Sequence, residues 1–170
     1  MPARNHDIHH WQMLNPVTTE ALIMLTLGAP QLLYNGGMLL APVRYFAVEG
    51  GVVRPGMPQD VGALVSKVSK MELEVTLVNM SAVFPRSMVV QAGTLREHRF
   101  TSVAFTALTS AYPAAVGAYA SPDVETTTES VTVDGSDFTV LLPPGTQVKL
   151  TIGLIRNVNF PTYDFPTVAA

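Results

Sequence analysis

Cysteine is absent from this 170-residue chain. The protein therefore forms no disulfide bond, has no thiol nucleophile and holds no metal ion through thiolate ligands. Long hydrophobic runs are absent as well. The longest, residues 21–27, is far shorter than the roughly 20 residues that a membrane-spanning helix needs. We therefore expect no membrane span.

Charged side chains are scarce, and the positive ones are scattered. Only 14% of the residues are charged, against about 25% in a typical globular chain. The ten lysine and arginine residues form no cluster and the net charge is −3, which argues against nucleic acid as a partner. The low charge and the 48% hydrophobic content indicate a surface committed to a protein partner or to self-association. The alternative is a compact domain whose polar faces consist of serine and threonine.

Motifs for catalysis and for phosphate binding are missing too. Gly36-Gly37 and Gly50-Gly51 precede predicted strands or loops rather than helices, so neither predicts a nucleotide site. The chain has no Gly-x-Ser-x-Gly sequence, which would place a serine nucleophile. We therefore expect no cofactor.

Short runs that alternate between apolar and polar residues dominate the chain after residue 70. In the clearest, Leu73, Val75 and Leu77 point one way and the residues between them the other, which predicts a strand with one buried face. The predicted strands are 71–79, 86–92, 96–107, 129–134, 137–142 and 146–155. We therefore predict a mainly β fold, an antiparallel β-sandwich or jelly-roll with one or two short helices in its N-terminal part.

The helices are predicted before residue 70. Asn15-Pro16 opens the first, because asparagine can cap a helix and proline is tolerated at its first position. This helix continues to Leu27 and ends at Gly28. Residues 60–68 predict a second helix, because their apolar residues recur at i, i+3, i+4 and i+7.

Turn residues separate these elements. Asn35-Gly36 and Asp134-Gly135 each predict a tight hairpin, since both dipeptides supply the positive φ angles of a type I′ turn. The second of these would pair strand 129–134 with strand 137–142. Residues 49–58 are rich in glycine and proline and predict a loop.

By composition the chain divides into three parts. Residues 1–14 are polar and histidine-rich, which is typical of an arm with little structure of its own. Residues 15–156 predict a single domain. Residues 157–170 predict an extended tail, rich in proline and aromatic side chains, that lies across a surface. The first residues lack the pattern of a signal peptide, so we expect a cytoplasmic protein.

Histidines gather near the N-terminus. His6, His9 and His10 lie close together, and imidazole suits zinc, copper or nickel. Their spacing matches no standard zinc pattern, and no neighbouring groups that would orient them are evident. The ordinary interpretation is an exposed arm with incidental histidines, and a partner contact is a third alternative.

His98 is the only histidine within the predicted domain, and Arg96 and Glu97 precede it. Charged neighbours can tune and orient an imidazole for general-base catalysis. On a strand, His98 and Arg96 share one face and Glu97 lies on the other. His98 with Arg96 is therefore a candidate catalytic pair. A strand histidine that hydrogen-bonds to a neighbouring segment is the alternative.

Three parts of the chain predict an interface. The helix 16–27 is apolar all round in its middle, which is typical of a helix covered on two sides. Arginine and aromatic side chains are enriched at protein interfaces. The predicted interface residues are Leu22, Met24, Leu25, Arg44, Tyr45, Phe160, Tyr163 and Phe165. For Arg44 and Tyr45 the alternative is a ligand-binding face.

Two short phrases carry a resemblance. The first runs from Leu73 to Ser81 and is followed by residues 88–91, Met-Val-Val-Gln, and the second is residues 140–145, Val-Leu-Leu-Pro-Pro-Gly. Both resemble strand–turn–strand phrases in the C-terminal β-sandwich accessory domains of bacterial carbohydrate-active enzymes, and the resemblance covers residues 71–155. It implies a domain that packs against a catalytic domain and carries no catalytic residue. A carbohydrate ligand has no support in the sequence itself.

The predicted function is a non-catalytic accessory or assembly subunit, which packs against a larger, carbohydrate-active partner or against itself. Two alternatives stay open. One is a small enzyme subunit with a pocket around His98 and Arg96, or with a pocket shared with a partner chain and using Arg44 and Tyr45. The other is a structural shell or filament protein.

Overall fold

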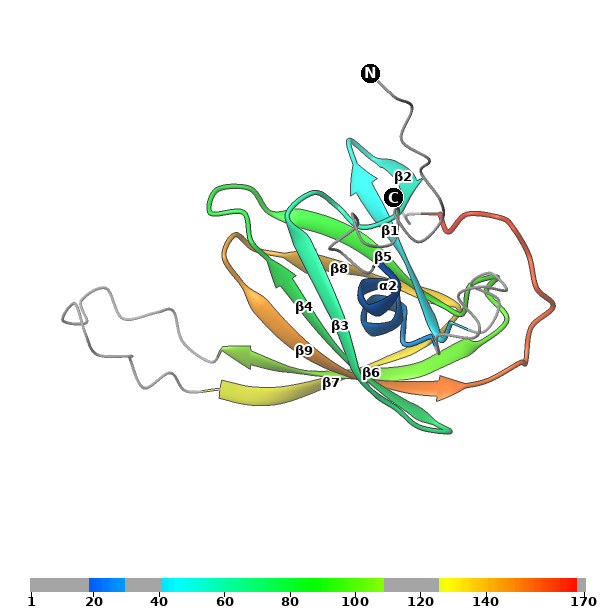
Figure 1. The fold of residues 1–170 in the computed structure, drawn as a ribbon. Helices are drawn as coiled ribbons and strands as arrows, with labels where there is room; N and C mark the ends of the chain where they lie inside the picture. The colour runs from blue at the N-terminus through cyan, green and yellow to red at the C-terminus, as the bar shows by residue number, and fades with distance from the viewer. Residues whose placement is uncertain (1–18, 30–40, 109–125, 168–170) are drawn as a thin grey trace, which may run out of the picture.

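The computed structural model describes residues 19–29, 41–108 and 126–167. Within these residues the chain forms two antiparallel β-sheets packed face to face, with one helix beside them (Figure 1). One sheet has four strands in the order β2-β1-β5-β8, and the other has five in the order β3-β4-β9-β6-β7. The fold is a β-sandwich, which confirms the predicted class.

The four-stranded sheet consists of β1 (Val43–Glu49), β2 (Val52–Pro55), β5 (Arg86–Ala92) and β8 (Asp137–Leu142). The five-stranded sheet consists of β3 (Val61–Val68), β4 (Glu72–Asn79), β6 (Arg99–Leu108), β7 (Thr126–Gly135) and β9 (Gln147–Ile155). The helix is α2 (Thr19–Leu27).

Alternation along β4 decides which of its faces is buried. This strand lies between β3 and β9 and buries Leu73, Val75 and Leu77 completely, as the sequence predicts. Glu72 and Glu74 point to the opposite, hydrated face. Burying a large aliphatic side chain stabilises a fold by about 1.5–3 kcal/mol, so the three inward side chains strongly favour this register of β4.

The predicted second helix is wrong, because residues 61–68 form β3. β3 pairs antiparallel with β4, and a register shift between Val65 and Lys67 interrupts the pairing. Val61 and Val65 are buried, whereas Leu64 and Val68 are exposed. Because of the β-bulge, Val65 and Val68 are three residues apart although their partners, Val75 and Leu73, are two apart. Leu64 is an apolar residue on the exposed side of the strand, so the four apolar residues fall at spacings that resemble those of a helix.

The predicted hairpin at Asp134-Gly135 is also wrong. β7 ends at this point in the five-stranded sheet, and β8 begins in the four-stranded sheet, so the two strands do not pair. Asp134 does adopt a positive φ of 48°. At this residue the chain turns from one sheet to the other. A residue that tolerates positive φ can form a connection between two sheets as well as the turn of a hairpin.

Three further predictions concern the first 58 residues: one is wrong in part, and two fall outside the described residues. Residues 49–58, predicted to be a loop, contain the short strand β2, which pairs with β1. The hairpin predicted at Asn35-Gly36 and the arm 1–14 lie outside the described residues.

The helix α2 closes one side of the sandwich. It packs beside β3, and Leu27 and Ala29 enter the core between the sheets. Gly28 ends the helix as predicted, with a φ of 69° and its N–H donating to the carbonyl of Met24 at 2.8 Å. A side chain at Gly28 would collide with Val65, so the glycine also lets α2 approach β3 closely.

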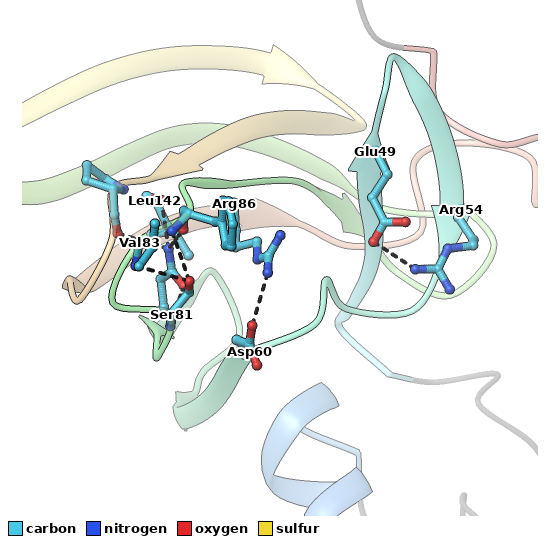
Figure 2. A network of polar contacts seen from close by, with 10 residues as sticks. Glu49, Arg54, Asp60, Ser81, Val83, Arg86 and Leu142 are labelled. Atoms are coloured by element: carbon cyan, nitrogen blue, oxygen red, sulfur yellow. Dashed lines mark hydrogen bonds and ion pairs between the residues drawn. The ribbon is translucent and has the colours of Figure 1, made fainter.

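Polar side chains tie the two sheets together at one end of the sandwich. The buried amide of Asn79, at the end of β4, donates to the carbonyls of Phe84, Leu142 and Pro143 at 3.0–3.1 Å. Figure 2 shows Arg86 reaching from β5 to the carboxylate of Asp60, just before β3, at 3.0 Å. Asn79 and Asp60 lie in or next to strands of the five-stranded sheet, whereas Arg86 and Leu142 lie in strands of the four-stranded sheet. These contacts therefore fix the position of one sheet relative to the other.

Candidate functional site

The most densely hydrogen-bonded region outside the strands is the loop between β5 and β6, residues 93–98. It begins with Gly93, whose φ is 85° and whose missing side chain leaves room for the carboxylate of Glu97. That carboxylate folds back and accepts a hydrogen bond of 2.7 Å from the N–H of Leu95. The loop is therefore a compact turn held by its own acidic side chain.

His98 and Glu97 lie side by side in this loop and not on opposite faces of a strand. β6 begins only at Arg99, so the predicted strand start at residue 96 is wrong by three residues. Both side chains are buried, with residue exposures of 4% for His98 and 6% for Glu97. His98 Nε2 lies 3.8 Å from Glu97 Oε1.

Both ring nitrogens of His98 face other parts of the protein. Nδ1 accepts a hydrogen bond of 3.1 Å from the backbone N–H of Asn157, so the proton of the neutral ring is on Nε2, facing Glu97. Burial lowers the pKa of His98, and the Arg156 guanidinium acts in the same direction, while the Glu97 carboxylate opposes them. A general base needs a free nitrogen within reach of a substrate proton, which this arrangement does not offer.

Arg96 does not join His98, in contrast to the predicted catalytic pair. Its guanidinium makes an ion pair of 2.9 Å with Asp137 at the start of β8. Arg44 approaches the same loop from β1 and donates to the carbonyl of Thr94 at 3.2 Å. The two arginines therefore fasten the loop to the four-stranded sheet.

Residues 157–167, hereafter the C-terminal segment, dock on this loop and continue along the outside of the sandwich (Figure 1). The N–H groups of Val158 and Asn159 donate to the carbonyl of Glu97, and that of Thr162 donates to Leu95. The Asn159 amide donates to three further acceptors: the carbonyls of Arg96 and His98, and the hydroxyl of Ser136.

The far end of the C-terminal segment packs on the outer face of the four-stranded sheet. The ring of Phe165 lies 5.5 Å from that of Phe46 between centroids, and Phe46 is fully buried. Pro166 is buried as well. Phe46 is not part of the inter-sheet core, so Phe165 covers an apolar side chain on the outer face of this sheet.

The predicted interface residues have different environments. Phe160 and Tyr163 project into solvent, with exposures of 97% and 81%, and Leu22, Leu25 and Phe165 are also exposed. Met24 and Arg44 are half-buried. Tyr45 is buried and cannot belong to a surface, because it points into the core and donates its hydroxyl to the carbonyl of Thr26 at 2.8 Å.

A cavity of about 420 Å³ brings Arg44 and Tyr45 together beside α2. Its other lining residues are Leu22, Thr26, Leu27, Pro55, Gly56 and Met57. Burial raises the pKa of the Tyr45 hydroxyl far above its usual range, and that hydroxyl already has an acceptor. The cavity thus offers mostly apolar walls beside the Arg44 cation, and none of its described lining residues is a carboxylate, a histidine or a lysine. His98 and Arg96 do not line it.

Metal ligands do not converge in the described part of the chain. No group of three or more histidine or acidic side chains there is placed to hold a metal ion. His6, His9 and His10, the predicted metal candidates, lie outside the described residues. Among the described helices, none has the length and apolarity to cross a membrane.

The residues that the sequence analysis missed are Gly93, Asn157 and Asn159. The available signal was the pair of asparagines directly after a strand, since asparagine side chains often hydrogen-bond to nearby backbone. Comparison of the chain with protein-family models, curated proteins and solved structures found no match.

Proposed function

We propose that this protein is a non-catalytic assembly subunit, which associates through exposed apolar side chains with a second copy or with a larger partner chain. The observation that carries the proposal is the C-terminal segment. Its backbone is held at the 93–98 loop by hydrogen bonds, while Phe160 and Tyr163 stand almost fully in solvent.

Fixed aromatic side chains are suited to binding. An aromatic ring buries a large area, and phenylalanine and tyrosine are enriched at protein interfaces. Ordering a loose segment on binding costs affinity, whereas a segment already held in place avoids most of that cost. The segment therefore resembles a pre-organised binding element more than a loose end of the chain.

The surroundings of His98 favour this proposal over an enzyme. Its Nδ1 accepts from Asn157 and its Nε2 faces Glu97, so the imidazole serves to attach the C-terminal segment. The cavity beside α2 is mostly apolar, and its described lining residues include Arg44 but no carboxylate or histidine that could act as an acid or base. The resemblance of residues 71–155 to accessory domains supports a carbohydrate-active enzyme as one possible larger partner.

The proposal is tested by native mass spectrometry of the wild type and of the variant Phe160→Ser/Tyr163→Ser at micromolar concentration. We expect an oligomer or a hetero-complex for the wild type and a monomer for the variant. The control is Met71→Ser/Val83→Ser, which removes exposed apolar side chains elsewhere and keeps the complex. A wild type that is monomeric, both purified and in extracts of its source, contradicts the proposal.

A further inference from the structure

Among the residues that the structure describes, three of the four edge strands of the sandwich are protected against pairing with another chain. β2 has only four residues and ends at Pro55, and β8 has six and is followed by Pro143. β3 carries a bulge between Val65 and Lys67, and α2 packs beside it. Short strands, prolines, bulges, lysines and covering helices are the devices that natural sheets use to block edge-to-edge association.

β7, the fourth edge strand, lacks these devices along most of its length. It has ten residues, contains no lysine, arginine or proline, and pairs only with β6 among the described strands. Residues 127–132 are all exposed. The one register shift in its pairing lies near its C-terminal end, opposite Phe100 and Ser102. Figure 1 shows β7 at the edge of the five-stranded sheet, and no other strand in the described part of the chain pairs with its outer side.

We propose that β7 is a self-association edge: the β7 strands of two copies pair antiparallel across a two-fold axis and join the two five-stranded sheets into one continuous sheet. The inference rests on the assembly role proposed above and names the partner as a second copy of this chain. Two-fold symmetry is the commonest arrangement of soluble homo-oligomers. It allows the backbone N–H and carbonyl groups of one β7 edge to hydrogen-bond to the same edge of the second copy.

The side chains of β7 are compatible with their own copy. Its residues from 126 to 133 are threonine, serine and valine apart from Glu129, and cross-strand threonine and valine pairs are favourable. Asp134 is held by Arg99 of the same chain. Glu129 is exposed and would oppose its own copy only in the single register centred on it. The two Glu129 carboxylates of a dimer would therefore lie directly opposite each other, and repel, in only one of the pairing registers.

The C-terminal segment adds area at one end of this edge. Asn159 donates to the hydroxyl of Ser136, the residue directly after β7, so the exposed ring of Phe160 stands near that end. Stable interfaces bury roughly 1,200–2,000 Å², more than two paired strands alone supply. Phe160 therefore adds an exposed aromatic ring to the area that the paired β7 strands supply.

A cysteine scan tests the pairing directly, because the wild-type chain has no cysteine. The variants are Thr128→Cys, Glu129→Cys, Ser130→Cys, Val131→Cys and Thr132→Cys, each treated with a mild oxidant at micromolar concentration. Across a two-fold axis one residue lies opposite its own copy, with Cα atoms about 4.5–5.5 Å apart, and a disulfide bridges Cα atoms about 4.4–6.8 Å apart.

We expect one position to form disulfide-linked dimers at least about tenfold faster than positions two residues away, whose Cα atoms lie beyond that range. The control Gln147→Cys is exposed on the inner strand β9 and should not cross-link. Five β7 variants that all cross-link as slowly as Gln147→Cys overturn the proposal.

A lysine variant separates this proposal from the proposed function. In any two-fold antiparallel register even-numbered residues oppose even-numbered residues, so Thr128→Lys/Ser130→Lys/Thr132→Lys places like charges opposite each other. We expect its dimer to dissociate at least about tenfold more readily. The control Gln59→Lys/Ala82→Lys/Gln147→Lys adds the same charge at exposed positions outside β7 and should stay dimeric.

The outcomes of the lysine experiment are distinct. A complex that survives the lysines in β7 but is lost in Phe160→Ser/Tyr163→Ser overturns the edge proposal and leaves the assembly role standing. A β7-dependent complex with a different chain, without a homodimer, overturns the choice of partner. Circular dichroism checks the fold of the lysine variant. If that variant is unfolded, the cysteine scan alone tests whether the β7 strands of two copies pair.

Discussion

The backbone N–H of Asn157 donates a hydrogen bond of 3.1 Å to Nδ1 of the buried His98 imidazole. The contact joins the first residue of the C-terminal segment to the loop that precedes β6, across a sequence separation of 59 residues. It requires an unprotonated Nδ1, so the attachment of the segment depends on the charge state of one histidine.

The stability of the protein should therefore depend on pH through His98. Because burial lowers the pKa of His98 in the folded protein, the unfolded chain binds more protons near the ordinary histidine pKa of about 6.5. Stability is then complete above about pH 6.5 and falls as the pH drops below that value. Urea unfolding at several pH values from about 5 to about 8 measures this dependence.

His98→Asn is the matched variant for this prediction. Asparagine can offer an acceptor oxygen near the position of Nδ1 but does not titrate. We expect the variant to lose most of the pH dependence that the wild type shows below about pH 6.5. Parallel curves for the two proteins would assign the effect to other groups.

A pair of glycines distinguishes crowding from backbone strain. Gly93 and Gly51 have similar φ angles of 85° and 80°, but only at Gly93 would a Cβ lie closer than 3.0 Å to another group, the carboxyl of Glu97. We expect Gly51→Ala to cost about 1–2 kcal/mol of unfolding free energy from the left-handed backbone alone. Gly93→Ala should cost about 1–3 kcal/mol more, because the added methyl group overpacks the loop. Equal losses in chemical denaturation would show that Glu97 moves aside.

Asn79 should be one of the most sensitive polar positions. Its amide donates to carbonyls of three residues at the end of the sandwich, and alanine would remove all three hydrogen bonds, including the buried one to the carbonyl of Leu142. We expect Asn79→Ala to lower the free energy of unfolding by about 2–4 kcal/mol, measured by urea denaturation. The neighbouring exposed Met80→Ala should change it by less than about 0.5 kcal/mol. A small effect at Asn79 would mean that water replaces the amide.

The Asn159 amide should control how firmly the C-terminal segment is held. It contacts Arg96, His98 and Ser136, so Asn159→Ala should release the segment locally while the sandwich stays folded. A loss of about 1–2 kcal/mol corresponds to roughly five- to thirtyfold faster cleavage by a protease specific for aromatic residues. Mass spectrometry of the fragments locates the cuts at Phe160 or Tyr163. The exposed Thr167→Ala is the control, and equal cleavage of both variants would contradict this role of Asn159.

Strands with a regular local pattern were predictable from the sequence. β5 and β8 have the predicted bounds, and β4 and β9 differ from them by one residue. β3 was not predictable in this way, because its bulge after Val65 disrupts the alternation from which strands are recognised. The corner at Asp134 was misread because its positive φ is a local property, whereas the choice between a hairpin and a change of sheet depends on distant strands.

The candidate site was predictable only in part. Its location at His98 was predicted because a histidine between two charged residues is conspicuous in any sequence. Its chemistry was not, since the partners of that histidine are Asn157 and Glu97, and the first comes from the other end of the domain. Arg96 was assigned to His98 by adjacency, but its ion pair with Asp137 depends on where β8 lies.

The sequence by itself determined that this protein is an antiparallel β-sandwich without thiol chemistry, because strand alternation and amino-acid composition are properties of the chain read locally. The tertiary structure alone decided which sheet each strand joins, that His98 is buried and bonded to the C-terminal segment, and that β7 lies at an edge among the described strands. These features depend on hydrogen bonds and packing between residues far apart in the chain. Such contacts form only when the whole sandwich does, so no local pattern encodes them.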